Sequence, residues 1–303
     1  MSELPLLLFC DNPLQPSAPD WSFDGEWAGA KAAGFETKLF SFEELVAGQA
    51  GRALARLPAA GAARPLIYRG WMMRDADYAR LYEALVAKGY APVTSPAAYD
   101  EAHYLPFAYP LLGADTAETA WSHGDDLDAA WAAARSLGPG PLVVKDFVKS
   151  AKHRWREACF LPDAFDRTAF DAVCSALRED RGEHFAKGFV FRRYLPLRER
   201  GVSALGAPLH DELRLFFWRG ELLPLPPYDA PEGGRASIER FGETARRFRG
   251  PFLTIDVAID ESGGWRVVES GDGGVSGVPP AISDATFYEA LAAAARARPP
   301  EAG

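Results

Sequence analysis

Short apolar runs alternate with amphipathic segments along the first hundred or so residues. PLLLFC has the continuous hydrophobicity of a buried strand, whereas DYARLYEALVAKGY has apolar residues spaced by three and four, as in a helix. Alternation of strands with helices predicts an α/β unit with a largely parallel sheet. We expect strands at 5–10, 35–41, 64–70 and 92–96, a turn-forming segment at 11–20, and helices starting within 42–46, at 77–90 and at 98–113, the last broken near Pro106.

The rest of the chain mixes helices with strands that carry charged residues. Arg219 and Gly220 are suited to the two-residue turn of a hairpin. We expect helices at 125–140, 166–180 and 239–250 and from residue 284 onward, and strands at 141–147, at 187–197, within the hairpin 212–225 and twice within 252–270.

Two apolar runs in FLTIDVAIDESGGWRVVESGDGGVSG, residues 252–277, each carry a carboxylate. Strand alternation turns Asp256 away from the packed face of its strand. With Ser262 and Gly263 as the central turn residues, Asp256 lies directly across from Glu269, and like charges in opposed positions destabilise a sheet. A hard cation such as Mg²⁺ would relieve the repulsion, with phosphate oxygens as further ligands. A solvated acidic hairpin is the alternative, and the spacing favours neither.

Lys145 lies inside LVVKDF, a run otherwise suited to a buried strand. A buried, unpaired ammonium group is costly, and an anionic group that enters a cleft, such as a phosphate, would offset that cost. Lys149, Lys152, His153 and Arg154 follow directly. These four residues form either a phosphate-binding loop or an ordinary solvated one.

Three arginines occupy strand-like segments, namely Arg192, Arg193 and Arg214. A single arginine within an apolar strand is commonly half of an ion pair, but several basic strands in one region predict a pocket for a polyanion. The chain has no GxxxxGK[ST] segment, which excludes a Walker-type phosphate loop as a motif.

Composition narrows the class of protein. The chain has 303 residues, enough for two or three compact units, and 48% of them are apolar. A net charge of -9 without a dense Lys/Arg block argues against a nucleic-acid partner. No apolar stretch near the start is long enough to span a membrane, and a signal peptide's basic region is missing there. The three cysteines lack CxxC spacing, which indicates reduced thiols in a cytoplasmic protein.

The order of these features resembles the ATP-grasp superfamily, over roughly residues 116–290. SLGPGPLVVKD resembles the family strand whose lysine contacts the nucleotide phosphates, and ELRLFFWRGELL resembles the strand with a phosphate-directed arginine. DVAID and WRVVESGDG are similar to the two metal-binding strands. The resemblance therefore assigns the phosphate contacts to Lys145 and Arg214, and magnesium to Asp256 and Glu269.

The likeness is greatest to an uncharacterised subgroup with two extra arginines and a lysine, through KDFVKSAKHRW and ESGDGGVSG. By that resemblance Lys152 or Arg154 closes over the phosphates from a lid loop, and Arg192 belongs to the extra-arginine signature. FVFRRYLPL occupies the place of the hinge strand that holds adenine, which adds Arg193, Tyr194 and Leu195 to the nucleotide contacts.

The sequence departs from the family in two places. Gly271 stands where the usual Glu-x-Asn ending has asparagine, and Asp272 is the expected replacement ligand. Arg192 and Arg193 replace the usual acidic residues of the hinge strand.

The resemblance implies an α+β ATP-grasp fold with an N-terminal α/β pre-ATP-grasp domain at 1–115, a lid subdomain at 116–195 and a large subdomain at 196–303 that together enclose an ATP cleft. It further implies a ligase that uses ATP and one or two Mg²⁺ to join a small-molecule or peptide carboxylate to an amine or thiol through an acyl phosphate. A small-molecule kinase and a non-catalytic nucleotide-binding module are the alternatives. Arg69, at a strand end, and Ser276 are the candidates for holding the substrate carboxylate. Neither a monomer nor a homodimer is favoured.

Overall fold

The computed structural model describes residues 4–202, 208–229 and 231–297. Its chain folds as two units, which we describe separately. Unit 1 contains residues 1–102, 214–255 and 271–303. Unit 2 contains residues 103–213 and 256–270.

Unit 1 is built on a parallel sheet, as the alternation of strands and helices predicts. Its parallel strands lie in the order β3-β1-β4-β5, and β2 pairs antiparallel with the end of β1. The strands are β1 (Leu6–Asn12), β2 (Gln15–Pro19), β3 (Thr37–Phe40), β4 (Arg64–Arg69) and β5 (Tyr90–Pro92). The helices that connect and follow them are α1 (Asp24–Ala32), α2 (Phe42–Val46), α3 (Ala50–Ala53), α4 (Asp75–Ala87) and α5 (Pro96–His103). The prediction missed β2, which lies within the segment expected to be a turn.

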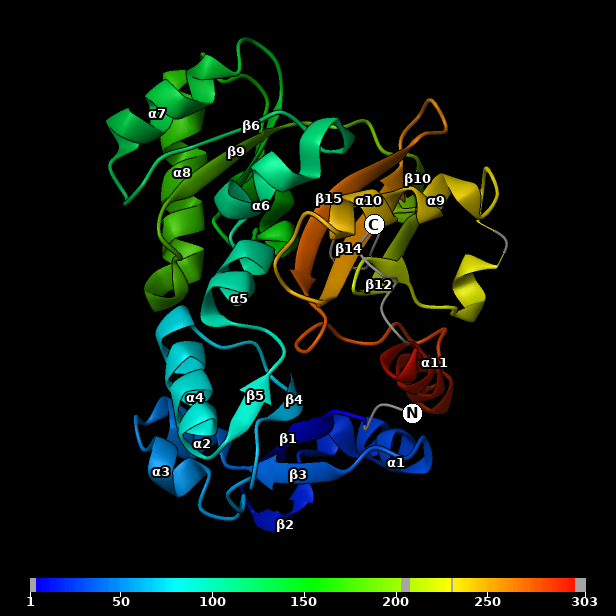
Figure 1. Cartoon of the computed structure of the whole chain (residues 1–303). Helices are drawn as coiled ribbons and strands as arrows, with labels where there is room; N and C mark the ends of the chain where they lie inside the picture. The colour runs from blue at the N-terminus through cyan, green and yellow to red at the C-terminus, as the bar shows by residue number, and fades with distance from the viewer. Residues whose placement is uncertain (1–3, 203–207, 230, 298–303) are drawn as a thin grey trace. The chain divides into compact units, whose positions relative to one another are not determined.

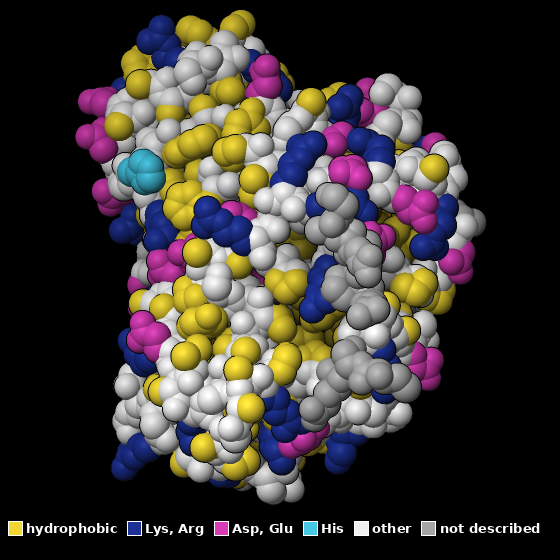
Figure 2. Space-filling model, in the orientation of Figure 1, with side chains coloured by type: hydrophobic (Ala, Val, Ile, Leu, Met, Phe, Trp, Pro, Cys, Tyr) yellow, Lys and Arg dark blue, Asp and Glu magenta, His cyan; other side chains and the backbone are white. Residues whose placement is uncertain are grey.

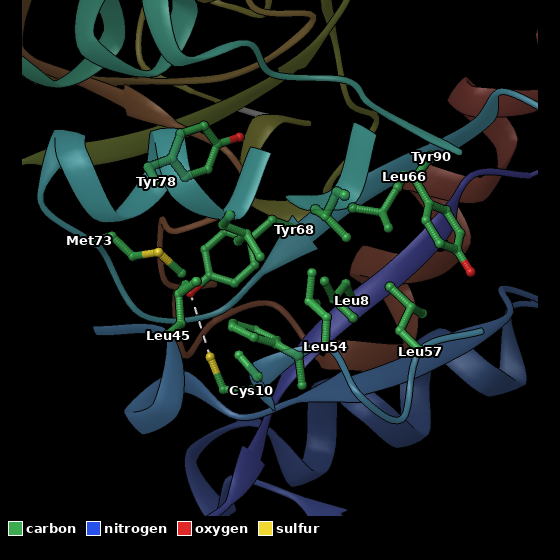
Figure 3. Packing of buried hydrophobic residues seen from close by; sticks show 14 of the residues in the cluster. Leu8, Cys10, Leu45, Leu54, Leu57, Leu66, Tyr68, Met73, Tyr78 and Tyr90 are labelled. Atoms are coloured by element: carbon green, nitrogen blue, oxygen red, sulfur yellow. Dashed lines mark hydrogen bonds between the residues drawn. The ribbon is translucent and has the colours of Figure 1, made fainter. Parts of the chain in front are cut away.

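Strand β1 is buried on both faces, which explains its unbroken run of apolar residues. Leu8 and Cys10 join a core cluster with side chains of α2 and α4 (Figure 3). Phe9 points to the other face, where its ring lies 5.4 Å from that of Trp27 in α1. It also lies 6.4 Å from the ring of Tyr288 in α11 (Asp284–Arg296). Helices α1 and α11 therefore cover one face of the sheet, and α2 to α4 cover the other (Figure 1).

The three cysteines are free and buried, as the sequence predicts. Cys10 lies 3.5 Å from the hydroxyl of Tyr68 (Figure 3). Burial raises the pKa of Cys10 to about 12 and that of Cys159 to about 11. These thiols are therefore protonated and contribute as small apolar side chains.

Unit 2 contains an antiparallel sheet in the order β6-β9-β7-β8. Ala130, Phe170 and Phe191 belong to its core, where two helices pack on one face of the sheet (Figure 1). The strands are β6 (Thr119–Trp121), β7 (Leu142–Asp146), β8 (Phe160–Leu161) and β9 (Phe189–Arg193), and the helices α6 (Leu105–Leu112), α7 (Leu127–Ser136) and α8 (Arg167–Arg181). The break between α5 and α6 falls at Tyr104, close to the predicted position at Pro106.

A third sheet has the order β13-β12-β14-β15. Its strands are β12 (Glu212–Trp218), β13 (Glu221–Leu222), β14 (Phe252–Ile259) and β15 (Trp265–Asp272). Arg219 and Gly220 both have positive φ, at 53° and 79°, which confirms the predicted two-residue hairpin turn. The remaining elements are β10 (Glu199–Val202), β11 (Pro208–His210), α9 (Ala236–Glu239) and α10 (Phe241–Ala245), and the last two replace the single helix expected at 239–250.

The turn between β14 and β15 differs from the prediction. Asp260 N–H donates to the Gly264 carbonyl, and Gly263 N–H donates to the Asp260 carbonyl, each at 2.9 Å. The loop therefore has three residues and ends with Gly263 at φ +85°, whereas a two-residue turn at Ser262 and Gly263 was expected. The Asp260 carboxylate selects this loop by accepting hydrogen bonds from Ser262 and from Gly264 N–H. The direct opposition of Asp256 and Glu269, which assumed the shorter turn, was thus wrong by one residue.

The surface carries charged side chains of both signs, which are interspersed over the face drawn in Figure 2. The net charge of -9 is therefore not gathered in one area of that face. None of the helices in the described part of the chain has the length and hydropathy needed to cross a membrane.

Gly70 offers a test of the packing around Tyr68. A Cβ at position 70 would lie 2.5 Å from Cys10 Sγ and 2.6 Å from the Tyr68 hydroxyl. This hydroxyl is held in place because it donates to the Trp71 carbonyl at 2.6 Å. We expect Gly70→Ala to lower the free energy of unfolding by about 2 kcal/mol, measured by urea denaturation.

Gly51 in α3 provides the control, because a Cβ there would meet nothing within 4 Å. Gly51→Ala should leave stability unchanged or raise it by up to about 1 kcal/mol through its helix propensity. Equal stability of the two variants would contradict the close packing at position 70.

Candidate active site

Unit 2 encloses a cavity of about 400 Å³. Its walls come from β7, β9 and the residues after β9, from the segment 149–155, from β11, and from the ends of β14 and β15 nearest their turn. Lys145, Asp256 and Glu269, the three residues central to the sequence prediction, all line this cavity. Asp256 and Glu269 are thus brought together although the predicted register does not hold.

Lys145 is 7% exposed, and its ammonium group lies 3.5 Å from Oε1 of Glu269. Burial lowers the pKa of Lys145, and the charge of Glu269 opposes this effect. Burial also acts to raise the pKa of Glu269, but the positive charges of Lys145, Lys149, Lys152 and Arg192 outweigh it and hold the pKa below its usual value. Glu269 is therefore ionised at neutral pH and can bind a cation.

Arg192, on β9, binds the backbone of β15. Its guanidinium donates to the carbonyl of Val268 at 2.5 Å and to the hydroxyl of Thr116 at 2.6 Å. Burial lowers the pKa of Arg192 to about 10, against the charge of Glu269. Arg192 therefore fixes the strand that carries Glu269, and it adds positive potential to the cavity that it lines.

Two buried nitrogen atoms of cavity residues have no hydrogen-bond partner among the described residues, namely Nε of Arg192 and Nδ1 of His210. Unsatisfied polar atoms are rare in a folded interior, and a ligand that fills the cavity would supply partners. His210 was not predicted as a site residue. It lies in the short strand β11, where no motif in the sequence points to it.

The basic segment after β7 divides its side chains between the cavity and the surface. Lys149, Lys152 and His153 line the cavity, and His153 Nε2 lies 2.8 Å from a carboxylate oxygen of Asp180. Arg154, at the end of a 3₁₀ turn formed by Lys152–Arg154, instead forms an ion pair with Glu157, three residues further on. Of the two predicted lid residues, only Lys152 therefore lines the cavity.

Aromatic side chains form another part of the wall. Trp155 begins a single π-helical turn, Trp155–Cys159, of the kind that often marks functional sites. Its ring stacks on Phe160 at 5.6 Å, and Phe160 in turn meets the edge of Tyr194 at 5.5 Å. Trp155, Tyr194 and Leu195 line the cavity. Trp155 was not predicted, although an aromatic residue beside a basic segment is a signal that could have identified it.

Arg193 has a different role from its neighbour. Its guanidinium donates to the carbonyl of Pro139 at 2.7 Å and also to the carbonyl of Leu137, both just beyond α7. A cation in this position satisfies carbonyl groups at a helix end and favours the helix dipole. The side chain of Arg193 therefore anchors α7. Its backbone remains the predicted nucleotide contact.

Asp272, the expected third metal ligand, belongs to unit 1 and is 4% exposed. Its carboxylate accepts hydrogen bonds from the Thr94 hydroxyl at 2.7 Å and from Gly274 N–H at 2.8 Å. No group of three or more His, Cys, Asp or Glu side chains in the described ranges could hold a metal ion. The predicted set of three carboxylates is thus not assembled. Three residues separate Asp272 from Glu269 on one strand, so alternation directs the two side chains to opposite faces.

Arg69 is 1% exposed and lies within unit 1. It donates to both carboxylate oxygens of Glu26, at 2.5 and 2.6 Å, and to the carbonyls of Gly274 and Ser276, at 3.1 and 2.7 Å. The Tyr288 hydroxyl also donates to Glu26. Arg69 is therefore placed to hold the loop that carries Ser276, and its burial is at odds with the predicted contact with substrate.

The other predicted residues of unit 1 lie around the same loop. Arg214 donates to the carbonyl of Gly277 at 3.2 Å. The hydroxyl groups of Ser276 and Thr254 are 2.8 Å apart. A Cβ at Gly271 would lie 3.1 Å from each of these two hydroxyl oxygens. The side-chain space at position 271 is thus bordered by two hydroxyl groups.

The cavity combines three kinds of surface. Lys145, Lys149 and Lys152 provide positive charge for a polyanion, Asp256 and Glu269 provide oxygen ligands for a hard cation, and the aromatic wall suits a planar ring. A nucleotide with its metal ion has all three complementary features.

Comparison with known proteins agrees with this chemistry. A family described as an ATP-grasp domain, the third family of its clade, matches residues 136–291. The chain matches none of the curated proteins.

Solved structures with a similar fold include a RimK domain protein ATP-grasp from Sphaerobacter thermophilus, with 17% identity, a TM-score of 0.55 and coverage of 95% of this chain and 98% of that one. A D-alanine–D-alanine ligase from Bacillus anthracis has 12% identity and a TM-score of 0.59, over 97% of this chain and 96% of that one. The ATP-grasp ligase PsnB, complexed with a minimal precursor, Mg and ADP, has 12% identity and a TM-score of 0.54, over 98% and 99%. At these identities the likeness shows the fold, and it confirms the predicted α+β ATP-grasp architecture.

Asp272 gives the fold a pH dependence of unusual sign. Burial raises its pKa to about 6 from 3.8, against the two hydrogen bonds that it accepts. Between these values the native carboxyl binds a proton that the unfolded one releases, so the free energy of unfolding rises as pH falls from about 7 to about 4. We expect Asp272→Asn to be more stable than wild type at pH 8, by roughly 1–3 kcal/mol, with the difference vanishing near pH 4 in urea titrations.

Asp260 is a control of opposite sign. Hydrogen bonds from Ser262 and from Arg266 hold the pKa of Asp260 well below its usual value. Asp260→Asn should therefore be less stable than wild type at pH 7, with a loss that shrinks toward low pH. The assignment of Asp272 fails if its variant follows the same trend as the Asp260 variant.

Proposed function

The chain belongs to this ATP-grasp domain family, and from this membership we propose that it is an ATP-dependent ligase. We infer that it joins a carboxylate to an amine or thiol through an acyl phosphate. The observation that carries the proposal is the buried ion pair of Lys145 with Glu269 inside a cavity that also contains Asp256.

The nucleotide fits the cavity by its chemistry. Its base would pack against the aromatic wall of Trp155 and Tyr194, and the unsatisfied nitrogen atoms of Arg192 and His210 would gain polar partners. Its phosphates would lie among the lysines, where their charge replaces the partner that a buried ammonium group requires.

Magnesium fits the pair of carboxylates. This ion is usually bound by one or two protein carboxylates, with phosphate oxygens and water completing its octahedron. Asp256 and Glu269 would hold one or two Mg²⁺, and the bound ion would neutralise charge on the β- and γ-phosphates. PsnB has been solved with Mg and ADP, which supports the pairing of metal and nucleotide in this fold.

The residues of the cavity would act by position and charge. A substrate carboxylate oxygen forms a bond to the γ-phosphorus while the bond to the bridging oxygen breaks and ADP leaves. Lys145 and Lys152 stabilise the charge that develops on the transferred group. An amine then attacks the acyl carbon, inorganic phosphate leaves, and the amine loses a proton to give an amide. Small-molecule and peptide carboxylates are both compatible with this scheme.

Glu269 provides the first test of the proposal. Glu269→Gln keeps the shape of the side chain but removes the charge that pairs with Lys145 and binds the metal. We expect turnover, measured as ADP release with a pool of carboxylates and amines, to fall by about 100-fold or more. Glu179→Gln, which removes the same charge from an exposed position of α8, should retain full turnover.

The same assay separates the ligase from a kinase. ADP release that requires an amine supports the ligase, whereas an accumulating phosphorylated product without amine would make the protein a kinase. Near-wild-type turnover of Glu269→Gln would remove the metal assignment.

Nucleotide binding itself is tested by thermal unfolding. ATP with Mg²⁺ at about 100 times its Kd should stabilise the protein by about 2.7 kcal/mol, seen as a rise in Tm. Lys145→Met removes the buried ammonium group but keeps its length, and it should abolish most of this rise. A Tm that ATP and Mg²⁺ leave unchanged in the wild type would contradict the nucleotide site and, with it, the ligase.

A further inference from the structure

The parallel sheet of unit 1 has a switch point between β1 and β4. From β1 the chain crosses through α1 to β3 on one side, and it later enters β4 on the other side of β1. In open α/β sheets, the connections after two such strands leave in opposite directions, and the crevice outside their carboxyl ends binds ligands. In this chain the crevice is bordered by the residues after β1 and by those after β4, at Gly70 and Trp71.

Two tryptophans lie in these connections and are exposed. Trp21 is 67% exposed and Trp71 is 44% exposed, although large aromatic side chains are mostly buried in folded proteins. The ring of Trp71 packs edge-on against buried Phe23, with the centroids 5.2 Å apart and the planes at 70°. Trp71 is therefore held in place by the fold while much of its surface remains open to a ligand.

Asp20 joins the two connections. Its N–H donates to the carbonyl of Cys10 in β1 at 3.0 Å, and its Oδ1 caps the short 3₁₀ helix Trp21–Phe23 by accepting from Ser22 N–H at 2.9 Å. Its other oxygen, Oδ2, lies 3.4 Å from Nε1 of Trp71. An ionised carboxylate has about four acceptor positions, so these contacts leave capacity for a further donor.

We propose that this switch-point surface, formed by Asp20, Trp21, Phe23 and Trp71, binds an organic ammonium group. The inference rests on the proposed function, in which that group belongs to the amine substrate of the ligase. It assigns a second recognition site to unit 1, separate in its residues from the nucleotide cavity of unit 2.

The charge of the surface selects a cation. A carboxylate at the edge of exposed indole rings attracts an ammonium group through both the ion pair and the negative faces of the rings. A carboxylate ligand would meet the like charge of Asp20, and a neutral apolar ligand would remove that charge from water without a partner. Arg69 lies 5.8 Å from the centre of the Phe23 ring, but its guanidinium is buried and bound to Glu26.

The test uses three probes of equal length that differ in charge: hexylammonium, hexanol and hexanoate. Binding is followed by NMR from the indole N–H signals of the uniformly labelled full chain, without nucleotide. The signals are assigned with the variants Trp21→Phe and Trp71→Phe. We expect hexylammonium to shift the Trp21 and Trp71 signals at millimolar concentration, hexanol to bind more weakly, and hexanoate to leave both signals in place.

Asp20→Asn isolates the charge, because asparagine keeps the cap on the 3₁₀ helix. We expect it to weaken hexylammonium binding by about fivefold or more. Asp126→Asn is the matched control, since Asp126 caps α7 in the same way by accepting from Asp128 and Ala129 N–H, and it should bind the probe like wild type.

Three results would overturn the inference: unshifted Trp21 and Trp71 signals with hexylammonium, equal shifts with all three probes, or equal affinity in Asp20→Asn and wild type. The outcome is independent of the nucleotide tests. A rise in Tm with ATP and Mg²⁺ together with unshifted indole signals would remove the ammonium site alone, whereas the reverse result would remove the ligase and leave a cation-binding surface.

Discussion

The buried ammonium group of Lys145 is the constraint around which the cavity of unit 2 is organised. A charge inside an otherwise apolar strand has to meet negative charge, and Glu269 supplies it from a strand 124 residues further along the chain. Arg192 then binds the backbone of that strand, which keeps the carboxylate where the lysine needs it. The arrangement concentrates positive potential and two carboxylates in one small space. The cost of burying Lys145 thereby becomes a preference for a ligand that brings phosphate and metal together.

Much of the fold could be predicted because its elements follow simple periodicities. The run LLLFC is apolar throughout since β1 is covered on both faces, and the hairpin at Arg219 and Gly220 follows from turn chemistry. The short strands β6 and β8 were missed. They contain three and two residues, too few to show a period, and only pairing with neighbours makes them strands.

The candidate site could be predicted where strand alternation decides a side chain's direction, and not where local hydrogen bonds decide it. Lys145 and Glu269 meet because both project from strands into one cavity. The carboxylate of Asp260 changes the length of the turn, and Asp272 binds Thr94, neither of which any spacing in the sequence indicates. Arg69 was expected at a ligand because it ends a strand, but its position next to Glu26 depends on a helix 43 residues earlier. Such contacts between distant segments are visible only in the folded chain.

The glycine at position 271 has a consequence for how the family's usual ending could be restored in this chain. The two hydroxyl groups of Thr254 and Ser276 already stand 3.1 Å from where a Cβ would be, and they are hydrogen-bonded to each other. An asparagine introduced alone would compete with both for the same volume, and Thr254 would also lose its bond to the Gly271 carbonyl. The glycine is therefore held in place by its neighbours. A chain that carries this pair of hydroxyls has to change at least one of them before an asparagine amide can be accommodated between them.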